Sequence, residues 1–160
     1  MRKDMHELSL EMSQGHWWPV ARRAILESLL GHFLGDAGNR SILEAGCGHG
    51  SNLCFLQRFG DVAGLECYAD AVASCRRSFP DAAIFEQAIP QSLPRRFDVI
   101  CLFDVLEHVD DDVGALAWVD RHLEEQGTVF LTVPAFPSMW SHWDDTVHHK
   151  RRYMRDDLVE

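Results

Sequence analysis

The sequence predicts an α/β fold in which a doubly wound sheet of about five parallel strands is covered by helices on both faces. Short, almost wholly apolar segments alternate with segments of helical periodicity between residues 40 and 135. Strands that are apolar at nearly every position are typical of parallel sheets buried on both sides. A glycine-rich loop follows the first strand, and right-handed crossovers favour the strand order 3-2-1-4-5 with ligands at the carboxyl ends.

The expected elements follow one another within a single domain, residues 1–160. A helical cap, residues 1–38, is indicated by apolar side chains at helical spacing after Pro19, which suits a first helical turn. The core, residues 39–135, then alternates strands with helices. We expect its strands at Ile42–Ala45, Val62–Glu66, Ala82–Phe85, Phe97–Leu102 and Thr128–Val133, and its helices at Gly50–Phe59, Ala69–Ser78 and Asp111–Leu123.

The last part, residues 136–160, is expected to form a substrate-side loop and the start of another helix. Arg155 to Leu158 contains acidic residues where the dipole of a first helical turn favours them. We therefore expect that the chain stops before the fold is complete and that the C-terminal strands of the full fold are missing. The fifth strand would then be an open edge, at which a dimer could form.

Composition excludes several classes of function. The net charge of −10 disfavours a nucleic-acid partner, although residues 148–152 form a local basic run that is usually a solvated surface. No apolar run approaches the length of a membrane span, and the N-terminal residues lack a secretory signal. The five cysteines are scattered, which favours reduced thiols over disulfides or zinc ligation. We therefore predict a cytoplasmic protein.

The strongest motif is the segment Glu44-Ala45-Gly46-Cys47-Gly48-His49-Gly50, between a strand and a helix. Its glycines permit a tight turn and a close approach to a ligand. A dinucleotide fingerprint would place its third glycine at the position of Ser51. Glu44 suits a cofactor that carries an ammonium and a sulfonium better than a pyrophosphate. Glu66 ends the next strand, 20 residues after Gly46, where a carboxylate can accept both ribose hydroxyls.

These segments resemble class I S-adenosylmethionine-dependent methyltransferases, which have a Rossmann-like fold. Residues 42–50 resemble their first motif, Leu65-Glu66-Cys67 the second, and residues 97–100 with 104–109 the region of the fourth strand. The resemblance implies that the glycine loop holds the methionine end of S-adenosylmethionine, Glu66 the ribose and Cys67 one adenine face. An acidic residue usually meets the adenine amino group; Gln87-Ala88 stands there instead, and an amide could replace it. The implied cofactor-binding residues are Glu44, Gly46, Cys47, Gly48, Glu66, Cys67, Gln87, Ala88 and Phe103.

The flanking segments resemble small-molecule methyltransferases of glycan and lipid biosynthesis. That resemblance implies that His16, Trp17 and Arg22 help to close the cofactor cleft. The alternative is that Trp17 and Trp18 only pack a helix onto the sheet.

Methyl transfer from a sulfonium requires alignment of the nucleophile and, for a hydroxyl, a base. His108 and His149 are the candidate catalytic residues because both are expected near the carboxyl edge of the sheet, although His108 could be a packing residue. We assign no metal ligand. A second hypothesis joins Asp104, Glu107, His108 and either His148 or His149 in a divalent metal site.

The sequence thus predicts a methyltransferase (EC 2.1.1.-) that moves a methyl group from S-adenosylmethionine to a small-molecule acceptor, to oxygen in preference to nitrogen or carbon. The motif [Asp/Asn]-Pro-Pro-[Tyr/Phe], which accompanies methylation of exocyclic amines in nucleic acid, does not follow the fourth strand. Two alternatives remain. One is a non-catalytic cofactor-binding or interaction module; the other is an NAD-dependent oxidoreductase, which the early third glycine and Glu44 disfavour.

Overall fold

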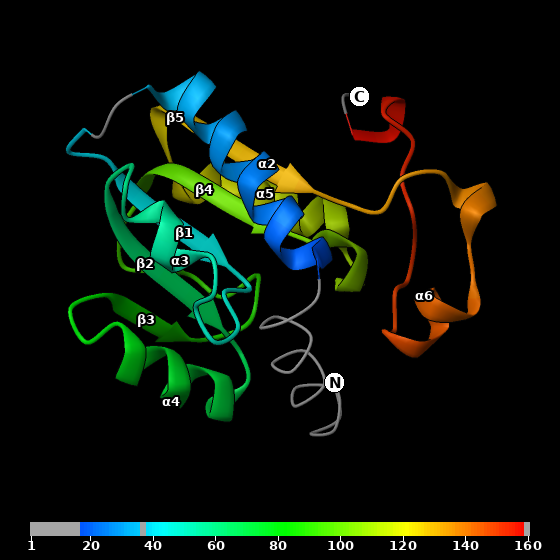
Figure 1. The fold of residues 1–160 in the computed structure, drawn as a ribbon, viewed down its shortest axis with the longest axis horizontal. Coiled ribbons are helices and arrows are strands. Elements are labelled where there is room, and N and C mark those ends of the chain that lie inside the picture. Colours follow the sequence, from blue (N-terminus) through cyan, green and yellow to red (C-terminus); the bar gives the residue numbers. More distant parts are fainter. Residues whose placement is uncertain (1–16, 36–37, 159–160) are drawn as a thin grey trace.

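The computed structural model describes residues 17–35 and 38–158 of the 160-residue chain. Its sheet has five strands in the order β3-β2-β1-β4-β5, and every neighbouring pair is parallel (Figure 1). The predicted α/β fold and its strand order are therefore confirmed. The strands are β1 (Ser41–Ala45), β2 (Asp61–Glu66), β3 (Ala83–Glu86), β4 (Phe97–Phe103) and β5 (Leu123–Thr132).

Helices connect the strands and cover the sheet. They are α2 (Trp17–Leu34), α3 (Leu53–Leu56), α4 (Ala69–Ser78), α5 (Asp112–His122) and α6 (His142–Thr146), with short 3₁₀ turns η1 (Leu106–His108), η2 (Pro137–Met139) and η3 (Asp156–Leu158). Figure 1 shows α2 lying across the strands while α6 stands apart from the sheet, on the segment that leaves β5.

Two apolar layers enclose the sheet. On one face, buried side chains of α2, α3 and α4 pack on one set of alternating strand residues, such as Ile42 and Val99. On the other face, Trp118 and Val119 of α5 pack on the intervening set, such as Leu43. Because successive strand residues point to opposite faces, strands covered on both sides must be apolar throughout. This is the pattern from which the sheet was predicted.

The helix expected at Gly50–Phe59 is much shorter in the structure. Gly50 has a φ of +86°, outside the right-handed helical region, so the helix cannot begin there. The amide of Leu53 donates to the Gly50 carbonyl, and that of Phe55 to Asn52, which are the i+3 bonds of turns. Only Leu53–Leu56 is α-helical.

The fifth strand begins earlier than expected. The side chain of Asp111 caps α5 by accepting a 2.8 Å hydrogen bond from the Gly114 amide, and the helix ends at His122. β5 follows at once from Leu123, which pairs with Phe97, but the register is irregular before Thr128 pairs with Val99. Within the described sheet β5 has only β4 as a neighbour. A dimer at this edge stays a prediction.

We call residues 133–158 the C-terminal arm; a loop and the start of a helix were expected over residues 136–160. The arm instead contains α6, with a capping box between Ser141 and Asp144. It returns to the sheet end through an isolated parallel bridge between Ala135 and Tyr153. The helix start expected at Arg155 is the single turn η3.

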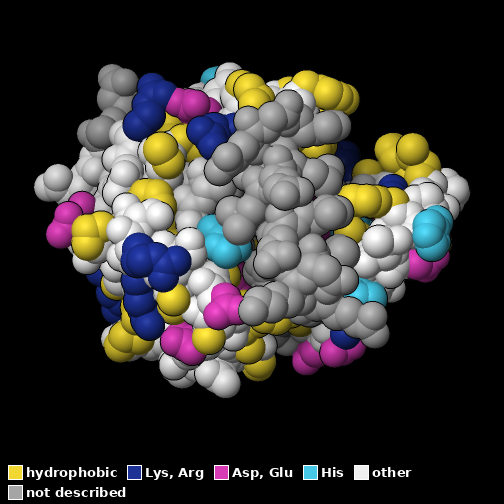
Figure 2. Space-filling view, turned by 60° about the horizontal axis from the view of Figure 1, so that its bottom comes forward, with side chains coloured by type: hydrophobic (Ala, Val, Ile, Leu, Met, Phe, Trp, Pro, Cys, Tyr) yellow, Lys and Arg dark blue, Asp and Glu magenta, His cyan; other side chains and the backbone are white. Residues whose placement is uncertain are grey.

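On the face drawn in Figure 2, the described acidic, basic and hydrophobic side chains are interspersed. Among the residues described, no helix combines the length and hydrophobicity needed to cross a membrane. All five cysteines lie in the described ranges and are free thiols, of which Cys47, Cys75 and Cys101 are buried.

Candidate functional site

A cavity of about 850 Å³ lies at the carboxyl ends of the strands. It is lined by the glycine loop after β1, the end of β2, the segment after β3, the turn after β4, the start of α5 and, from the C-terminal arm, Val147, His148 and Lys150. The structure thus brings together most of the residues that the sequence singled out. The predicted residues that line it are Gly46, Cys47, Gly48, Glu66, Cys67, Gln87, Ala88, Phe103 and His108.

The glycine loop adopts backbone torsions that residues with a side chain rarely adopt. Gly46 and Gly48 have φ angles of +77° and +54°. The amides of Gly46 and Cys47 both donate to the Leu65 carbonyl, at 2.7 and 3.0 Å, which ties the loop to β2. A Cβ on Gly46 would lie 2.6 Å from Cγ2 of Val105, whereas one on Gly48 would meet nothing within 4 Å. Gly46 therefore serves close packing, and Gly48 leaves space on the cavity side.

Glu66 joins the loop to the end of β2. Its Oε2 accepts a 3.0 Å hydrogen bond from the Gly48 amide, and its Oε1 accepts from the amides of Cys67 and Tyr68 at 2.8 and 3.0 Å. The side chain lines the cavity although the residue is only 7% exposed. A carboxylate has about four acceptor positions, so Glu66 keeps capacity for a ligand.

Glu44 lies behind the loop and does not itself line the cavity. Its Oε1 accepts a 2.6 Å hydrogen bond from Nδ2 of Asn52, which does line the cavity. Its Oε2 has no hydrogen-bond partner among the described residues. Burial raises the pKa of Glu44 to about 8. The predicted contact between Glu44 and the cofactor stays a prediction.

Gln87 occupies the position at which related proteins usually have an acidic residue. Its backbone amide donates to the carbonyl of Glu66 at 3.0 Å, which fixes the segment after β3 beside the end of β2. Its side-chain Oε1 is buried and without a hydrogen-bond partner in the described part of the chain. An amide oxygen of this kind can accept from an amino group.

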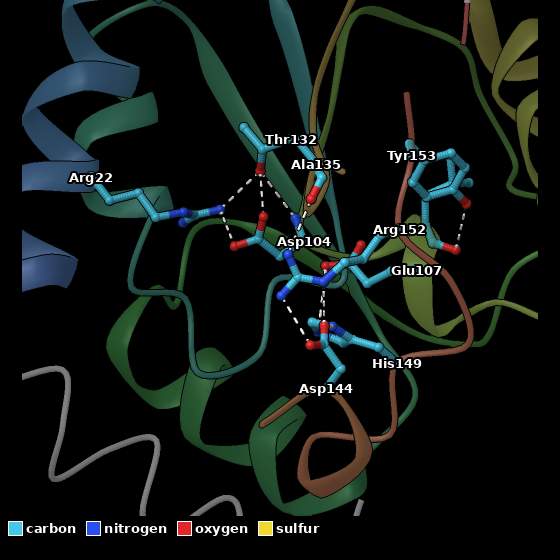
Figure 3. A network of polar contacts seen from close by, with 10 residues as sticks. Arg22, Asp104, Glu107, Thr132, Ala135, Asp144, His149, Arg152 and Tyr153 are labelled. Atoms are coloured by element: carbon cyan, nitrogen blue, oxygen red, sulfur yellow. Dashed lines mark hydrogen bonds and ion pairs between the residues drawn. The ribbon is translucent and has the colours of Figure 1, made fainter. Parts of the chain in front are cut away.

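The two predicted catalytic histidines occupy different positions. His108 lines the cavity, and desolvation together with the neighbouring His149 lowers its pKa. His149 is not among the cavity-lining residues. Its ring meets that of His108 edge-on, with centroids 4.9 Å apart. Its Nδ1 lies 2.9 Å from Oδ1 of Asp144 (Figure 3). His149 therefore stands behind His108, between the cavity and a buried carboxylate.

The basic run 148–152 is largely bound to acidic side chains rather than solvated. Arg152 donates from Nε and Nη2 to the two carboxylate oxygens of Asp144, at 2.8 and 2.9 Å. Arg151 pairs with Asp112 at 2.6 Å, and the Tyr153 hydroxyl donates to the same carboxylate at 3.0 Å. Sequence reasoning missed Asp112 and Asp144. The only indication in the sequence was that the basic run at residues 148–152 needs acidic partners, which does not identify Asp112 or Asp144.

Arg22 of α2 reaches the rim of the cavity. It pairs with Asp104 at 2.7 Å and donates to Thr132 at 3.0 Å (Figure 3). Asp104 lines the cavity, so α2 does extend to the cleft at this point. His16 lies outside the described residues, and the Trp17 side chain is largely exposed. Their expected part in closing the cleft stays a prediction.

Comparison with known proteins identifies the family. A methyltransferase domain family matches residues 19–158 of this chain. An N,N-dimethyltransferase of dTDP-3-amino-3,4,6-trideoxy-α-D-glucopyranose from Streptomyces venezuelae is 32% identical over 107 residues, which cover 63% of this chain and 45% of the relative. A ubiquinone biosynthesis O-methyltransferase from Methylococcus capsulatus is 32% identical over 101 residues, covering 58% and 43%. The chain spans less than half the length of these two relatives.

Solved structures of methyltransferases share this fold. The structure of CalS10 with bound S-adenosylmethionine, an amino pentose methyltransferase from Micromonospora echinaspora, superimposes with a TM-score of 0.69. It is 22% identical, and the match covers 88% of this chain and 61% of CalS10. This similarity supports the fold, and the family match covers nearly the whole chain. The chain belongs to the methyltransferase domain family.

Proposed function

We propose that this chain binds S-adenosylmethionine in the cavity and transfers its methyl group to a small-molecule acceptor. The observation that carries this proposal is the Glu66 carboxylate, which is held at the cavity by the amides of Gly48, Cys67 and Tyr68. The position at the end of β2 is the one from which an acidic side chain accepts ribose hydroxyls in this class of sheet.

The buried carboxyl group behind the glycine loop supports a cationic cofactor. Burial raises the pKa of Glu44 to about 8 in spite of the hydrogen bond from Asn52, so the ionised form of Glu44 is disfavoured. An ammonium or sulfonium nearby would stabilise that form, whereas a pyrophosphate would oppose it. This contrast favours S-adenosylmethionine over NAD. When bound, S-adenosylmethionine supplies an electrophilic methyl group, and the cavity walls would align it with the acceptor.

The acceptor atom is the finer part of the proposal. We predicted a hydroxyl, for which His108 at the cavity wall would act as base, with His149 behind it. A second candidate is an amine, because a relative at 32% identity is named as an amino-sugar N,N-dimethyltransferase. An amine must likewise lose a proton, so either acceptor uses the same histidine. A cytoplasmic location and a non-nucleic-acid acceptor stay predictions.

The decisive experiment is calorimetric titration with S-adenosylmethionine and S-adenosylhomocysteine, with NAD as the competing cofactor. We expect micromolar binding of the first two and none of NAD. Glu66→Ala should lose this binding, because three backbone donors and the ribose hydroxyls lose their acceptor. Glu86→Ala is the matched control, since Glu86 pairs in register with Glu66 at the end of the neighbouring strand and does not line the cavity.

The titration also separates the alternatives. Binding of NAD instead would contradict the proposal in favour of an oxidoreductase. Binding of S-adenosylmethionine without turnover of amino-sugar or hydroxylated acceptors would favour a non-catalytic module. An equal loss of S-adenosylmethionine binding in Glu66→Ala and Glu86→Ala would show that the loss is not specific to the carboxylate at the ribose position.

A further inference from the structure

Three potential metal-binding side chains converge where the turn η1 meets the C-terminal arm. They are Glu107 and His108 from the turn and His149 from the arm. One possible ligand atom from each lies within 4.8 Å of the other two. The chain thus brings one carboxylate and two imidazoles together from segments about 40 residues apart.

Glu107 is the unexplained member of this cluster. It is fully buried, at 0% exposed. Neither of its carboxylate oxygens has a hydrogen-bond partner among the described residues. Buried carboxylates are ordinarily paired, hydrogen-bonded or bound to a metal, because an unpartnered one costs several kcal/mol of desolvation. The burial of Glu107 is therefore not offset by a side-chain hydrogen bond from the described residues.

The orientation of His149 turns Nε2 toward Glu107. Asp144 accepts two hydrogen bonds from Arg152, and its Oδ1 lies 2.9 Å from Nδ1 of His149. With Nδ1 turned to this carboxylate, Nε2 lies 3.9 Å from Oε1 of Glu107 (Figure 3). That distance is too long for a hydrogen bond. It fits two ligands of one ion, each at about 2.1 Å.

We propose that Glu107, His108 and His149 bind a divalent first-row transition-metal ion. Two imidazoles and one carboxylate form a donor set for such ions rather than for Mg²⁺ or Ca²⁺. Asp144 occupies the position of the outer carboxylate that orients a metal-bound histidine. Three protein ligands leave positions open, and His108 places them toward the cavity. With the ion bound, His108 would be a ligand and not the base, and the ion would instead polarise an acceptor oxygen or nitrogen on that side.

The geometry narrows the wider ligand set suggested by the sequence. Asp104 pairs with Arg22 and with Thr132, so its carboxylate is engaged elsewhere. His148 lines the cavity but does not belong to the cluster of three. The site therefore uses His149 and not His148. The inference does not depend on S-adenosylmethionine binding.

The test uses the metal-free chain, without S-adenosylmethionine, titrated with Co²⁺ and followed by visible d–d absorption and calorimetry. We expect one equivalent to bind with the spectrum of nitrogen and oxygen ligation. His149→Ala and Glu107→Gln should each weaken binding by about 100-fold or more, since removal of even an outer-shell partner costs about 10–100-fold. His148→Ala is the matched control and should keep the affinity within about twofold of the unmodified chain.

His108→Ala secures the test against misfolding. His108 is exposed, so its truncation should leave the fold intact, as thermal melting of the metal-free variant will show. Weakened Co²⁺ binding in this folded variant is expected. The proposal would be overturned by a folded chain that binds no Co²⁺, by unchanged affinity in His108→Ala, or by loss in His148→Ala with retention in His149→Ala. A thiolate charge-transfer spectrum would also overturn it, because it would place the ion on cysteine.

Discussion

Two buried carboxyl groups, neither of which lines the cavity, have opposite electrostatic surroundings. Glu44, in the glycine-loop half, is 1% exposed and has one neutral donor, Asn52, so burial raises its pKa to about 8. Asp144, in the C-terminal arm, is 0% exposed, and hydrogen bonds led by those from Arg152 hold its pKa far below the usual range. One is therefore protonated at neutral pH, and the other is ionised.

The two carboxyl groups differ in whether the described part of the protein supplies a hydrogen-bonded cationic partner: Asp144 has one and Glu44 does not. Glu44 has no cationic partner within hydrogen-bond distance among the described residues, so a cationic ligand would add one. The charge of Asp144 is instead used within the protein, where it holds His149 and the arm in place. Groups with strongly perturbed pKa values are enriched at functional sites, which favours the Glu44 side as the one that meets a ligand.

The pH dependence of stability tests the Glu44 half of this comparison. The folded-state pKa is raised, so the contribution of Glu44 is fully present below about pH 4.5 and is lost as pH rises toward 8. We expect the free energy of unfolding to fall by about 3 kcal/mol more in the unmodified chain than in Glu44→Gln between pH 5 and 8. Urea denaturation at both pH values measures this difference. Parallel pH profiles would show that Glu44 is ionised in the folded chain.

The glycine loop offers a second test, in which stability and binding should separate. Gly46→Ala places a methyl group 2.6 Å from Val105 at a φ of +77°, so we expect a loss of about 2–4 kcal/mol. Gly48→Ala meets nothing within 4 Å and should cost only about 1–2 kcal/mol. Because Gly48 faces the cavity, its variant should lose S-adenosylmethionine affinity. Denaturation measures the stability of both variants, and calorimetry measures their affinity for S-adenosylmethionine. A Gly48→Ala variant less stable than Gly46→Ala would contradict the assignment of packing to Gly46 and binding to Gly48.

The half of the molecule around the glycine loop was predictable because its signals are local. Strand, glycine loop and terminal acid follow one another between residues 42 and 66, and alternation of apolar segments fixes the sheet around them. The error at Gly50 was also local, since the sequence does not show which glycine takes a positive φ. The cavity wall contains nearly all the predicted cofactor residues for the same reason.

The C-terminal arm could not be predicted because its structure depends on distant pairs. Arg151 and Tyr153 contact Asp112, which lies some 40 positions away in the sequence. The periodicity of apolar residues does not predict such contacts. His108 and His149 were singled out by residue type, but only the fold shows that one lines the cavity and the other stands behind it. Within residues 17–35 and 38–158, the arm adds one isolated bridge, between Ala135 and Tyr153, to the strand pairing.

This dependence on ion pairs predicts that the arm opens separately from the sheet. Arg152→Ala removes both cationic donors from Asp144, so α6 and the residues around His149 should lose amide protection by about tenfold or more. Amides of β1 and β4 should exchange as before, because their bonds lie within the sheet. Hydrogen exchange followed by mass spectrometry measures both regions. Equal loss of protection in the strands would show that arm and sheet unfold together.

The smallest effect is expected where α2 meets the cavity rim. The Arg22–Asp104 pair is partly solvated, with side chains 20% and 47% exposed, so Arg22→Ala should cost only about 0.2–1 kcal/mol. Arg23→Ala, at an exposed neighbouring position, should change the stability less. Because Arg22 binds a cavity-lining carboxylate, its loss should alter acceptor binding more than unfolding. Denaturation of both variants and acceptor titration of Arg22→Ala measure this. If Arg22→Ala lowered the free energy of unfolding by several kcal/mol, the Arg22–Asp104 contact would be what holds α2 on the sheet. Arg22 would then resemble Arg152, whose ion pair is used within the protein.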